Sequence, residues 1–508
     1  MTRPTRVPQA LVLSGFDISG AALLAPHGCE DCACSVSESM ESRTWPAAPQ
    51  TSGVSRWVRG AEVTKINIDR EHSLLFNPLG SGGAVVVNDT ALAVLDRFAR
   101  PADLTEARVT GPEREPDAGY VFDRLSRLEF IHPAGQPQSP RFTEGKLLTA
   151  WLHVTNACNL RCPYCYLHKS PEKMDDSIGR ASVDAVVRSA VRHGFPAVKL
   201  KYAGGEASLN HRLLRELHEY ARSLTSRHGI ALHATLLSNG VRLPPSLVDL
   251  LKSLNIRVMI SLDGIGGYHD RQRPFVNGKP SFALVERTIG GLIEQGHPPH
   301  LSITITNRNA AGLADTIRFA LDRDLTFSLN FFRDNDCSAT FSDLQYEEQG
   351  LIGSLLEAFL VIEEKLPRWS VLGSILDRGQ LLEPRQRSCG VGQDYLVIDQ
   401  RGRVAKCHME IESTLGDVLS EDPLQLVRND LNLVQNLAVE QKEGCRDCTW
   451  RYWCSGGCAV ATFRATGRYD IKSPNCGIYR AIYPEALRLE GLRILKYADP
   501  SFCYISGK

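Results

Sequence analysis

The chain has 508 residues, more than one ordinary hydrophobic core holds, and this length predicts about two to four domains. Basic and acidic residues balance at 58 each and 43% of residues are hydrophobic, so bulk charge gives no reason to expect nucleic-acid or membrane binding. No apolar run approaches the ~18 residues that span a bilayer, and the N-terminus lacks signal-peptide architecture, so we expect a cytoplasmic protein.

The first 135 residues predict two regions. Residues 1–60 are rich in Ser, Pro, Ala and Gly and predict a poorly structured segment. Metal binding by its three close cysteines stays open, because no fourth ligand lies near them: Cys29, Cys32 and Cys34. Residues 61–135 predict a small α+β module, with short strands in VTKINI, HSLLFN and AVVVND and helical spacing in TALAVLDRFA and YVFDRLSRLEFI.

Strand and helix patterns alternate over residues 145–340. Six apolar runs predict strands, and helical spacing separates them: LLTAWLHVT, AVKLKYAG, ALHATLLSN, IRVMISLDG, HLSITITN and TFSLNFFRD. This alternation is typical of an α/β fold with a parallel sheet and right-handed crossovers. Six units suit a partial (β/α)6 TIM-like barrel, because a complete barrel has eight units and about 250 residues.

The remainder of the chain predicts three segments. These are a helical connector over 341–385, a cysteine-rich domain over 386–485 and a C-terminal tail over 486–508. YLVIDQRGRVAKC predicts a hairpin that turns at Gln400–Gly402. Strands here are short and no apolar core is evident, so metal clusters would supply the missing cross-links.

Cysteine is the most informative residue type, with fifteen copies that mostly cluster. Three lie at 158–165 and seven between 389 and 476. Clustered cysteines in a large chain without a signal sequence favour metal ligation over disulfides. Cys337 and Cys503 lie apart from these clusters and fit buried free thiols.

The first cluster, in VTNACNLRCPYCYLH, places Cys158, Cys162 and Cys165 at the spacing C-x3-C-x2-C, where the first predicted strand ends. Three thiolates can hold three irons of a cubane and leave the fourth iron open. A zinc site would need a fourth ligand, for which only His168 lies near. The motif resembles that of the radical S-adenosylmethionine (SAM) superfamily, over about residues 147–335. This resemblance implies that the open iron binds SAM, whose cleavage releases a 5′-deoxyadenosyl radical.

The same resemblance implies a SAM-binding rim at the strand ends. YAGGEAS ends the second strand, and its glycines let backbone carbonyls approach the methionine amine. LLSNG ends the third strand, SLDG ends the fourth, and an arginine in HDRQRP suits a carboxylate partner. A surface ion pair is the alternative for Asp263 and Arg273, and a core strand position is the alternative for Ile305. The residues assigned to this rim are Tyr164, Gly204, Gly205, Glu206, Ser238, Asn239, Ser261, Asp263, Arg273 and Ile305.

Seven later cysteines have the spacing C-x12-G-x4-C, then C-x2-C-x5-C-x3-C, then a final cysteine. The pattern resembles the SPASM extension of radical enzymes that modify peptides, which binds two auxiliary [4Fe–4S] clusters. The resemblance implies an outer cluster held by Cys445, Cys448, Cys454 and Cys476. It implies an inner cluster held by Cys389, Cys407 and Cys458. The inner cluster therefore has either a distant fourth ligand or an open iron.

The residues after Cys407 narrow the chemistry. Relatives that mature sulfatases have a carboxylate directly after this cysteine, whereas this chain has His408, Met409 and Glu410. Formylglycine formation is therefore disfavoured. His408 or Glu410 would still serve as a base toward a substrate radical, and ordinary loop residues are the alternative.

The sequence thus predicts a radical SAM oxidoreductase with three [4Fe–4S] clusters that matures a ribosomally made precursor peptide. A carbon–carbon or carbon–heteroatom cross-link is the expected product, and epimerisation stays open. Flavodoxin or ferredoxin would donate the low-potential electron. The 61–135 module is similar to a winged-helix-like leader-recognition element, which would add the leader peptide as a strand; a structural extension is the alternative. Two other functions stay open: a radical SAM dehydrogenase of a protein side chain or small molecule, and a non-catalytic iron–sulfur scaffold.

Overall fold

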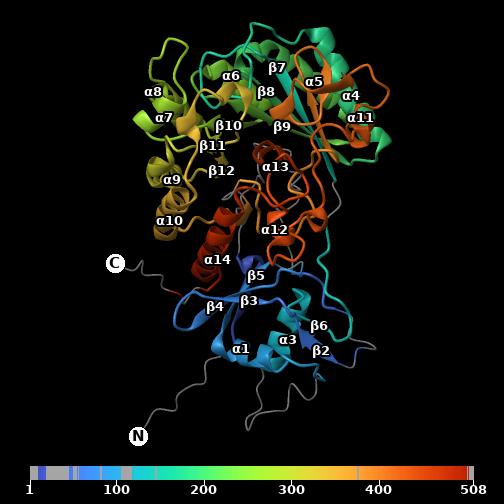
Figure 1. The fold of residues 1–508 in the computed structure, drawn as a ribbon, viewed down its shortest axis with the longest axis vertical. Coiled ribbons are helices and arrows are strands. Elements are labelled where there is room, and N and C mark those ends of the chain that lie inside the picture. The colour runs from blue at the N-terminus through green and yellow to red at the C-terminus, as the bar shows by residue number, and fades with distance from the viewer. Residues whose placement is uncertain are drawn as a thin grey trace.

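A computed structural model describes residues 10–18, 45–49, 54, 56–80, 83–103, 117–142, 146–373, 377–499 and 502. The cysteines at positions 29, 32, 34 and 503 lie outside these residues. Three regions follow one another along the long axis (Figure 1): an α/β domain, the cysteine-rich region and the N-terminal module. No helix in the described part of the chain is long and apolar enough to cross a membrane.

The α/β domain is built on six parallel strands that lie side by side in chain order. These strands are β7 (Leu147–Thr155), β8 (Ala197–Gly204), β9 (Ala231–Ser238), β10 (Arg257–Ser261), β11 (His300–Ile305) and β12 (Phe327–Phe331). Each of the six apolar runs contains one of them. The prediction of an α/β fold with a mainly parallel sheet is therefore confirmed.

Helices lie between these strands and pack on the sheet (Figure 1). They are α4 (Asp176–Arg192), α5 (His211–Arg227), α6 (Pro245–Ser253), α7 (Gly267–Gln272), α8 (Phe282–Glu294) and α9 (Leu313–Leu321), and α10 (Glu348–Lys365) follows β12. The Asp175 carboxylate starts α4 by accepting a hydrogen bond from the Ile178 amide at 2.8 Å. Gly194, with φ 69°, follows its end. β7 is buried along its whole length, which explains why its sequence is a continuous apolar run.

The cysteine-rich region continues the same sheet. β13 (Tyr395–Ile398) pairs with β7 in parallel, and β14 (Arg403–Ala405) and β15 (Thr414–Asp417) add antiparallel strands, giving nine strands in all. The predicted hairpin is confirmed, and Gly402 takes φ 79° in its turn. Because β14 ends at Ala405, Cys407 and His408 follow directly after a strand of the shared sheet.

The N-terminal module contains a separate antiparallel sheet in the order β1-β5-β4-β3. Its elements are β1 (Val12–Ser14), β3 (Thr64–Asn67), β4 (His72–Phe76), β5 (Ala84–Asn88), α1 (Asp89–Asp96) and α3 (Asp117–Arg127), beside a pair formed by β2 (Trp57–Arg59) and β6 (Ile131–Pro133). The prediction that 1–60 lacks structure is wrong for β1 and β2, because both strands complete sheets whose partners lie further along the chain.

A single long helix, α14 (Cys476–Ala498), joins the cysteine-rich region to the N-terminal module (Figure 1). The predicted tail over 486–508 is therefore wrong for 486–498, which continue this helix. Gly491 permits close packing, since a Cβ at this position would lie 2.5 Å from Cδ1 of Ile68. The helix is apolar on more than one face because the N-terminal sheet covers its second half.

Residues 450–453, in the cysteine-rich region, supply a second contact with the module. The Trp453 indole Nε1 donates a hydrogen bond to the Pro78 carbonyl at 3.0 Å. Its ring meets Phe76 edge to face with centroids 4.8 Å apart, and Trp450 stacks on Phe76 at 5.4 Å. Phe76 and Trp453 are fully buried, so the contact is part of a hydrophobic core.

We expect Phe76→Ala to lower the free energy of unfolding by about 3–5 kcal/mol, because removing the ring leaves a cavity between two tryptophans. Chemical denaturation followed by tryptophan fluorescence measures the loss. Arg59→Gln is the control, since the Arg59–Asp96 ion pair is 38% and 66% exposed and such pairs contribute about 0–1 kcal/mol. Equal effects of the two substitutions would contradict the assignment of Phe76 to this interface.

Candidate functional site

A cavity of about 220 Å³ lies at the carboxyl ends of the parallel strands. Gly204, Ser238, Ser261 and Phe331, which end four of these strands, contribute to its wall. The loop after β7 and the segment after β14 complete it. This is the edge of the sheet at which α/β folds generally place their ligands.

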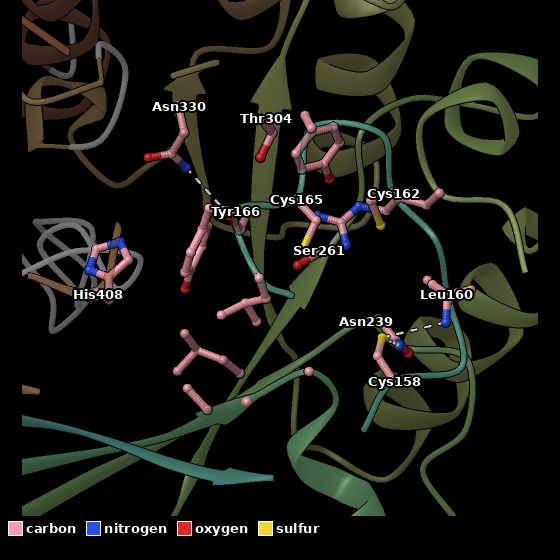
Figure 2. Close-up of a pocket in the computed structure, with 18 of the residues that line it drawn as sticks. Cys158, Leu160, Cys162, Cys165, Tyr166, Asn239, Ser261, Thr304, Asn330 and His408 are labelled. Atoms are coloured by element: carbon pink, nitrogen blue, oxygen red, sulfur yellow. Dashed lines mark hydrogen bonds between the residues drawn. The ribbon is translucent and has the colours of Figure 1, made fainter. Parts of the chain in front are cut away.

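The three cysteines of the first cluster line one side of this cavity, whereas His408 lies on the opposite side (Figure 2). The Cys158 thiol accepts a hydrogen bond from the Leu160 amide at 3.4 Å and one from the Asn239 side chain at 3.9 Å. Burial raises the pKa of Cys162 to about 12; Arg273 opposes this effect, and the nearby Cys165 and Cys158 contribute to it. The three thiols are therefore close enough to repel one another as anions, which suits ligands of one cationic centre.

The arrangement of the three thiols distinguishes between a single metal ion, such as zinc, and an iron–sulfur cluster. Among the described residues, no three His, Cys, Asp or Glu side chains are placed so as to hold a single metal ion. A cubane has a different requirement, because each thiolate binds its own iron. His168, the only candidate for a zinc ligand, pairs with Glu412 at 3.0 Å and is largely exposed. The cysteine loop thus fits a cluster better than zinc.

Gly204 and Gly205 lie where β8 meets the cysteine loop. A Cβ on Gly204 would lie 2.3 Å from the Thr155 carbonyl oxygen, and one on Gly205 would lie 2.4 Å from that of Ala157. The sequence explained these glycines by close approach of a ligand. They also line the cavity, but the immediate requirement is contact between two backbone segments.

The Glu206 carboxylate ties β8 to the next strand. One oxygen accepts the Ser238 hydroxyl at 2.9 Å and the other accepts the Asn239 amide at 2.6 Å. The Asn239 side chain in turn reaches Asn159 in the cysteine loop at 2.7 Å. Three of the predicted rim residues, Glu206, Ser238 and Asn239, therefore form one network with the cluster loop, and all three line the cavity.

A buried ion pair joins Asp263 and Arg273, with Nε and Oδ2 2.6 Å apart and side chains only 0% and 10% exposed. The Tyr164 hydroxyl also donates to this carboxylate, and the Arg273 guanidinium lies 5.5 Å from the Tyr164 ring. Burial raises the pKa of Tyr164 well above its usual range, and Asp263 adds to this effect. The pair is therefore buried behind the cavity wall, to which Arg273 contributes, and the surface alternative is wrong. Ser261 and Arg273 reach the cavity itself.

Ile305 does not line the cavity. It is fully buried in the hydrophobic core, whereas Ser302 and Thr304 on the same strand contribute to the cavity wall. Successive side chains of a strand point to opposite faces, so Ile305 lies on the face opposite Thr304. The alternative of a core position is thus the correct one.

His408 lies in an aromatic enclosure at the cavity wall. Its ring stacks on Trp151 with centroids 4.6 Å apart and an angle of 14°, and Tyr166 meets it edge to face at 5.7 Å. Its Nδ1 is 3.1 Å from the Tyr395 hydroxyl. In Figure 2, Tyr166 lies between His408 and Cys165. The imidazole is therefore held in one orientation beside the cavity.

Glu410, the other candidate base, is placed differently. It forms an ion pair with Arg464 at 2.8 Å and is absent from the cavity wall. The prediction that Glu410 lies in the site is therefore corrected: the structure places its side chain outside the cavity wall. The short 3-10 turn from His408 to Glu410 explains this, because it points the two side chains in different directions.

The seven later cysteines separate into the two predicted sets. Burial raises the pKa of Cys445 to about 12, and the thiols that add to this effect are Cys454, Cys476 and Cys448. Burial raises the pKa of Cys407 to about 12, and there the contributing thiols are Cys458 and Cys389. The four and the three are thus neighbours within each set. All eleven cysteines in the described part of the chain are free thiols.

Several wall residues escaped the sequence analysis. Lys169 hydrogen-bonds the Cys165 thiol, and although burial lowers its pKa, this thiol raises the pKa overall. Arg333 and Arg378 lie between the cavity and the second set of cysteines. Arg333 lies at the end of the sixth apolar run, TFSLNFFRD, and a charged residue at the end of a predicted strand is a signal for a site residue. Arg378 lies in a stretch without a regular pattern and offers no such signal.

Comparisons with known proteins agree with this geometry. A family model described as the radical SAM superfamily matches residues 152–320. The chain is 27% identical over 260 residues to sporulation killing factor maturation protein SkfB of Bacillus subtilis (strain 168), covering 50% of this chain and 59% of that protein. It is 24% identical over 332 residues to antilisterial bacteriocin subtilosin biosynthesis protein AlbA of the same organism, covering 61% and 67%.

Among solved structures, that of anSMEcpe with bound AdoMet and Cp18Cys peptide superposes with a TM-score of 0.55. The two chains are 17% identical, and the match covers 68% of this chain and 99% of the other. This likeness establishes a shared fold. The family match identifies a radical SAM domain over residues 152–320 of this chain.

Proposed function

We propose that the protein is an oxidoreductase that cleaves SAM to a 5′-deoxyadenosyl radical and matures a ribosomally made precursor peptide, forming an intramolecular cross-link. One observation carries the proposal: a single cavity has the cysteine loop on one side and His408, next to a cysteine of the second set, on the other. A substrate side chain in this cavity would lie between a radical source and a second redox centre.

The six-stranded domain, taken as a partial barrel, would hold the initiating [4Fe–4S] cluster at Cys158, Cys162 and Cys165. When bound there, the cluster and SAM supply the radical. The rest of the rim would orient SAM, with Arg273 suited to its carboxylate because a guanidinium matches that group geometrically. Asp263 and Glu206 would act indirectly, since their oxygens already hold Arg273, Asn239 and other rim groups.

The second set of cysteines would hold two auxiliary [4Fe–4S] clusters in the predicted division of four and three. Forming a cross-link removes two hydrogen atoms from the peptide. The radical takes one atom, and the other must leave as a proton and an electron. A cluster held by Cys389, Cys407 and Cys458 would supply an acceptor for this electron, and we propose that His408 takes the proton. An external flavodoxin or ferredoxin would deliver the electron that starts the reaction.

The names of two relatives, a maturation protein for a sporulation killing factor and a biosynthesis protein for a bacteriocin, support a peptide substrate. The N-terminal module offers a place for its leader. β3 forms one edge of the four-stranded sheet, whereas the other edge, β1, is covered by α3. Tyr120 and Arg124 of α3 donate to the Val12 carbonyl of β1 at 3.2 and 3.3 Å. The leader would therefore add as a strand beside β3.

The proposal is tested by co-expressing the protein with a short candidate peptide encoded beside its gene, followed by mass spectrometry. A product lighter by two hydrogen atoms, with a cross-link located by fragmentation, is the expected result. Deuterium incorporation without that loss would indicate epimerisation. Turnover of a free small molecule, with all candidate peptides unchanged, would favour the dehydrogenase, and failure to cleave SAM would favour the scaffold.

Replacing one thiolate of the initiating cluster should abolish SAM cleavage. We expect Cys162→Ala to lose about four of the ~12 irons of three cubanes and to yield no 5′-deoxyadenosine under dithionite. Iron analysis and chromatography measure both quantities. Cys337→Ser is the matched control, since Cys337 lies outside the two motifs and should keep the wild-type values. Retained cleavage in Cys162→Ala would overturn the radical SAM assignment of this loop.

His408→Gln should separate cleavage from modification. The variant keeps a hydrogen-bonding side chain but cannot take a proton, so we expect 5′-deoxyadenosine to form while peptide product falls about 10²–10⁴-fold. Glu410→Gln is the control and should stay within a few-fold of wild type, because Glu410 is paired with Arg464 outside the cavity wall. If the two variants lose product equally, His408 has no special role.

A further inference from the structure

Two buried arginines lie between the cavity and the inner set of cysteines, Cys389, Cys407 and Cys458. Arg333 follows β12 with a side chain that is 10% exposed, and Arg378 is 6% exposed. Both line the cavity. The SAM-binding rim and the aromatic enclosure of His408 do not include them. Their position instead indicates a role toward the inner set.

Arg333 is held by a rigid set of partners. One terminal nitrogen, Nη1, donates to the Phe331 carbonyl at 3.1 Å, and the other, Nη2, pairs with Asp377. The Asp377 carboxylate also accepts the Phe331 amide at 3.1 Å and the Tyr479 hydroxyl at 2.9 Å. The guanidinium is thus held by two partners, and one of them, Asp377, is itself fixed by two further hydrogen bonds.

The fixed guanidinium is close enough to the buried Cys458 thiol to act on it electrostatically, and together with Arg378 it lowers the pKa of this thiol against the effect of burial. Arg378 acts electrostatically on all three inner thiols. Lys442 is a third cation near this set, and Asp377 is the carboxylate that faces Cys458. The inner set therefore has two buried arginines directly on its cavity side.

The outer set has no such pair of arginines among the cations that act on it. The buried Lys442 acts on Cys445 and Cys454 of this set as well as on the inner set, and Arg480, which reaches the Cys448 thiol at 3.7 Å, is exposed to solvent. Water screens such a charge, whereas a buried charge acts through a lower effective dielectric constant. Cations and hydrogen-bond donors at cluster thiolates favour the reduced state of an iron–sulfur cluster. The two sets thus differ in the charge that surrounds them.

We propose that Arg333 and Arg378 are positioning residues that raise the reduction potential of the inner cluster, with Asp377 limiting the effect. This inference rests on the proposed function, because it needs a cluster at Cys389, Cys407 and Cys458. The reaction in question is the reduction of that cluster, in which it would accept one electron from a reductant. No bond to the protein forms or breaks, and the arginines stay protonated. The arginine pair would make the inner cluster the better electron acceptor at the cavity.

The test is an EPR-monitored redox titration of the reconstituted full chain with dithionite, without peptide. Arg333→Gln and Arg378→Gln should each shift the midpoint potential of the inner cluster to a more negative value. Asp377→Asn removes a negative charge and keeps both arginines, so it should shift the potential the opposite way. Arg333→Lys keeps the charge and should restore much of the wild-type value. Arg480→Gln is the matched control and should leave the inner potential unmoved.

Opposite shifts in the glutamine and asparagine variants support the inference, since a purely structural role would not reverse sign. If Arg333→Gln loses iron, Asp377→Asn decides, and an unchanged potential in that variant overturns the inference. The same conclusion follows if Arg333→Gln keeps its iron and its potential. A wild-type protein without a third cluster signal would instead contradict the three-cluster proposal, so the two failures are distinguishable.

Discussion

The parallel pairing of β13 with β7 is the contact on which the site depends. β7 leads into the loop with Cys158, and β13 leads through its hairpin to Cys407 and His408. Pairing the two strands in one register fixes the distance between two groups of residues that lie about 250 positions apart in sequence. Without this pairing the cysteine-rich region would have no defined place relative to the cavity, because its own strands are short and its apolar core is small.

Several buried carboxylates around the cavity form hydrogen bonds and ion pairs with other residues of the protein. Glu206 holds the ends of two neighbouring strands together, Asp263 holds Arg273 and Tyr164, and Asp377 holds Arg333. Buried carboxylates are costly unless they are fully hydrogen-bonded, and here they meet that condition without a ligand. Their effect is to fix the dipoles and cations that face the cavity, so that binding and chemistry require little further reorganisation. A carboxylate in a motif is therefore not necessarily the group that touches the ligand.

The sequence alone predicted those features of the structure that depend on residues close together in the chain. Buried parallel strands appear as continuous apolar runs, and cysteine spacing reports a loop geometry that a cluster requires. Prediction from the sequence failed where an element depends on contacts with residues far away in the chain. α14 continues past its predicted end because the N-terminal sheet covers it, and β1 belongs to a sheet whose other strands come more than 50 residues later. Ile305 and Glu410 were misplaced for a more local reason. A shift of one residue along a strand moves a side chain to the opposite face, and a tight turn points residues two positions apart in different directions.

The cysteine-rich region also connects the N-terminal module to the α/β domain. The residues between Cys448 and Cys454 provide Trp450 and Trp453 to the buried contact with Phe76, and Arg451 pairs with Glu62 of the module at 3.2 Å. α14 begins at Cys476 and ends against the sheet of the module. The outer cysteines and the contacts with the module therefore lie on the same short segments. Fixing the conformation of the cysteines would also fix the side chains that contact the module, because only a few residues separate them. A centre at the outer cysteines would then fix the place of the module relative to the α/β domain, even though this set lies away from the cavity wall.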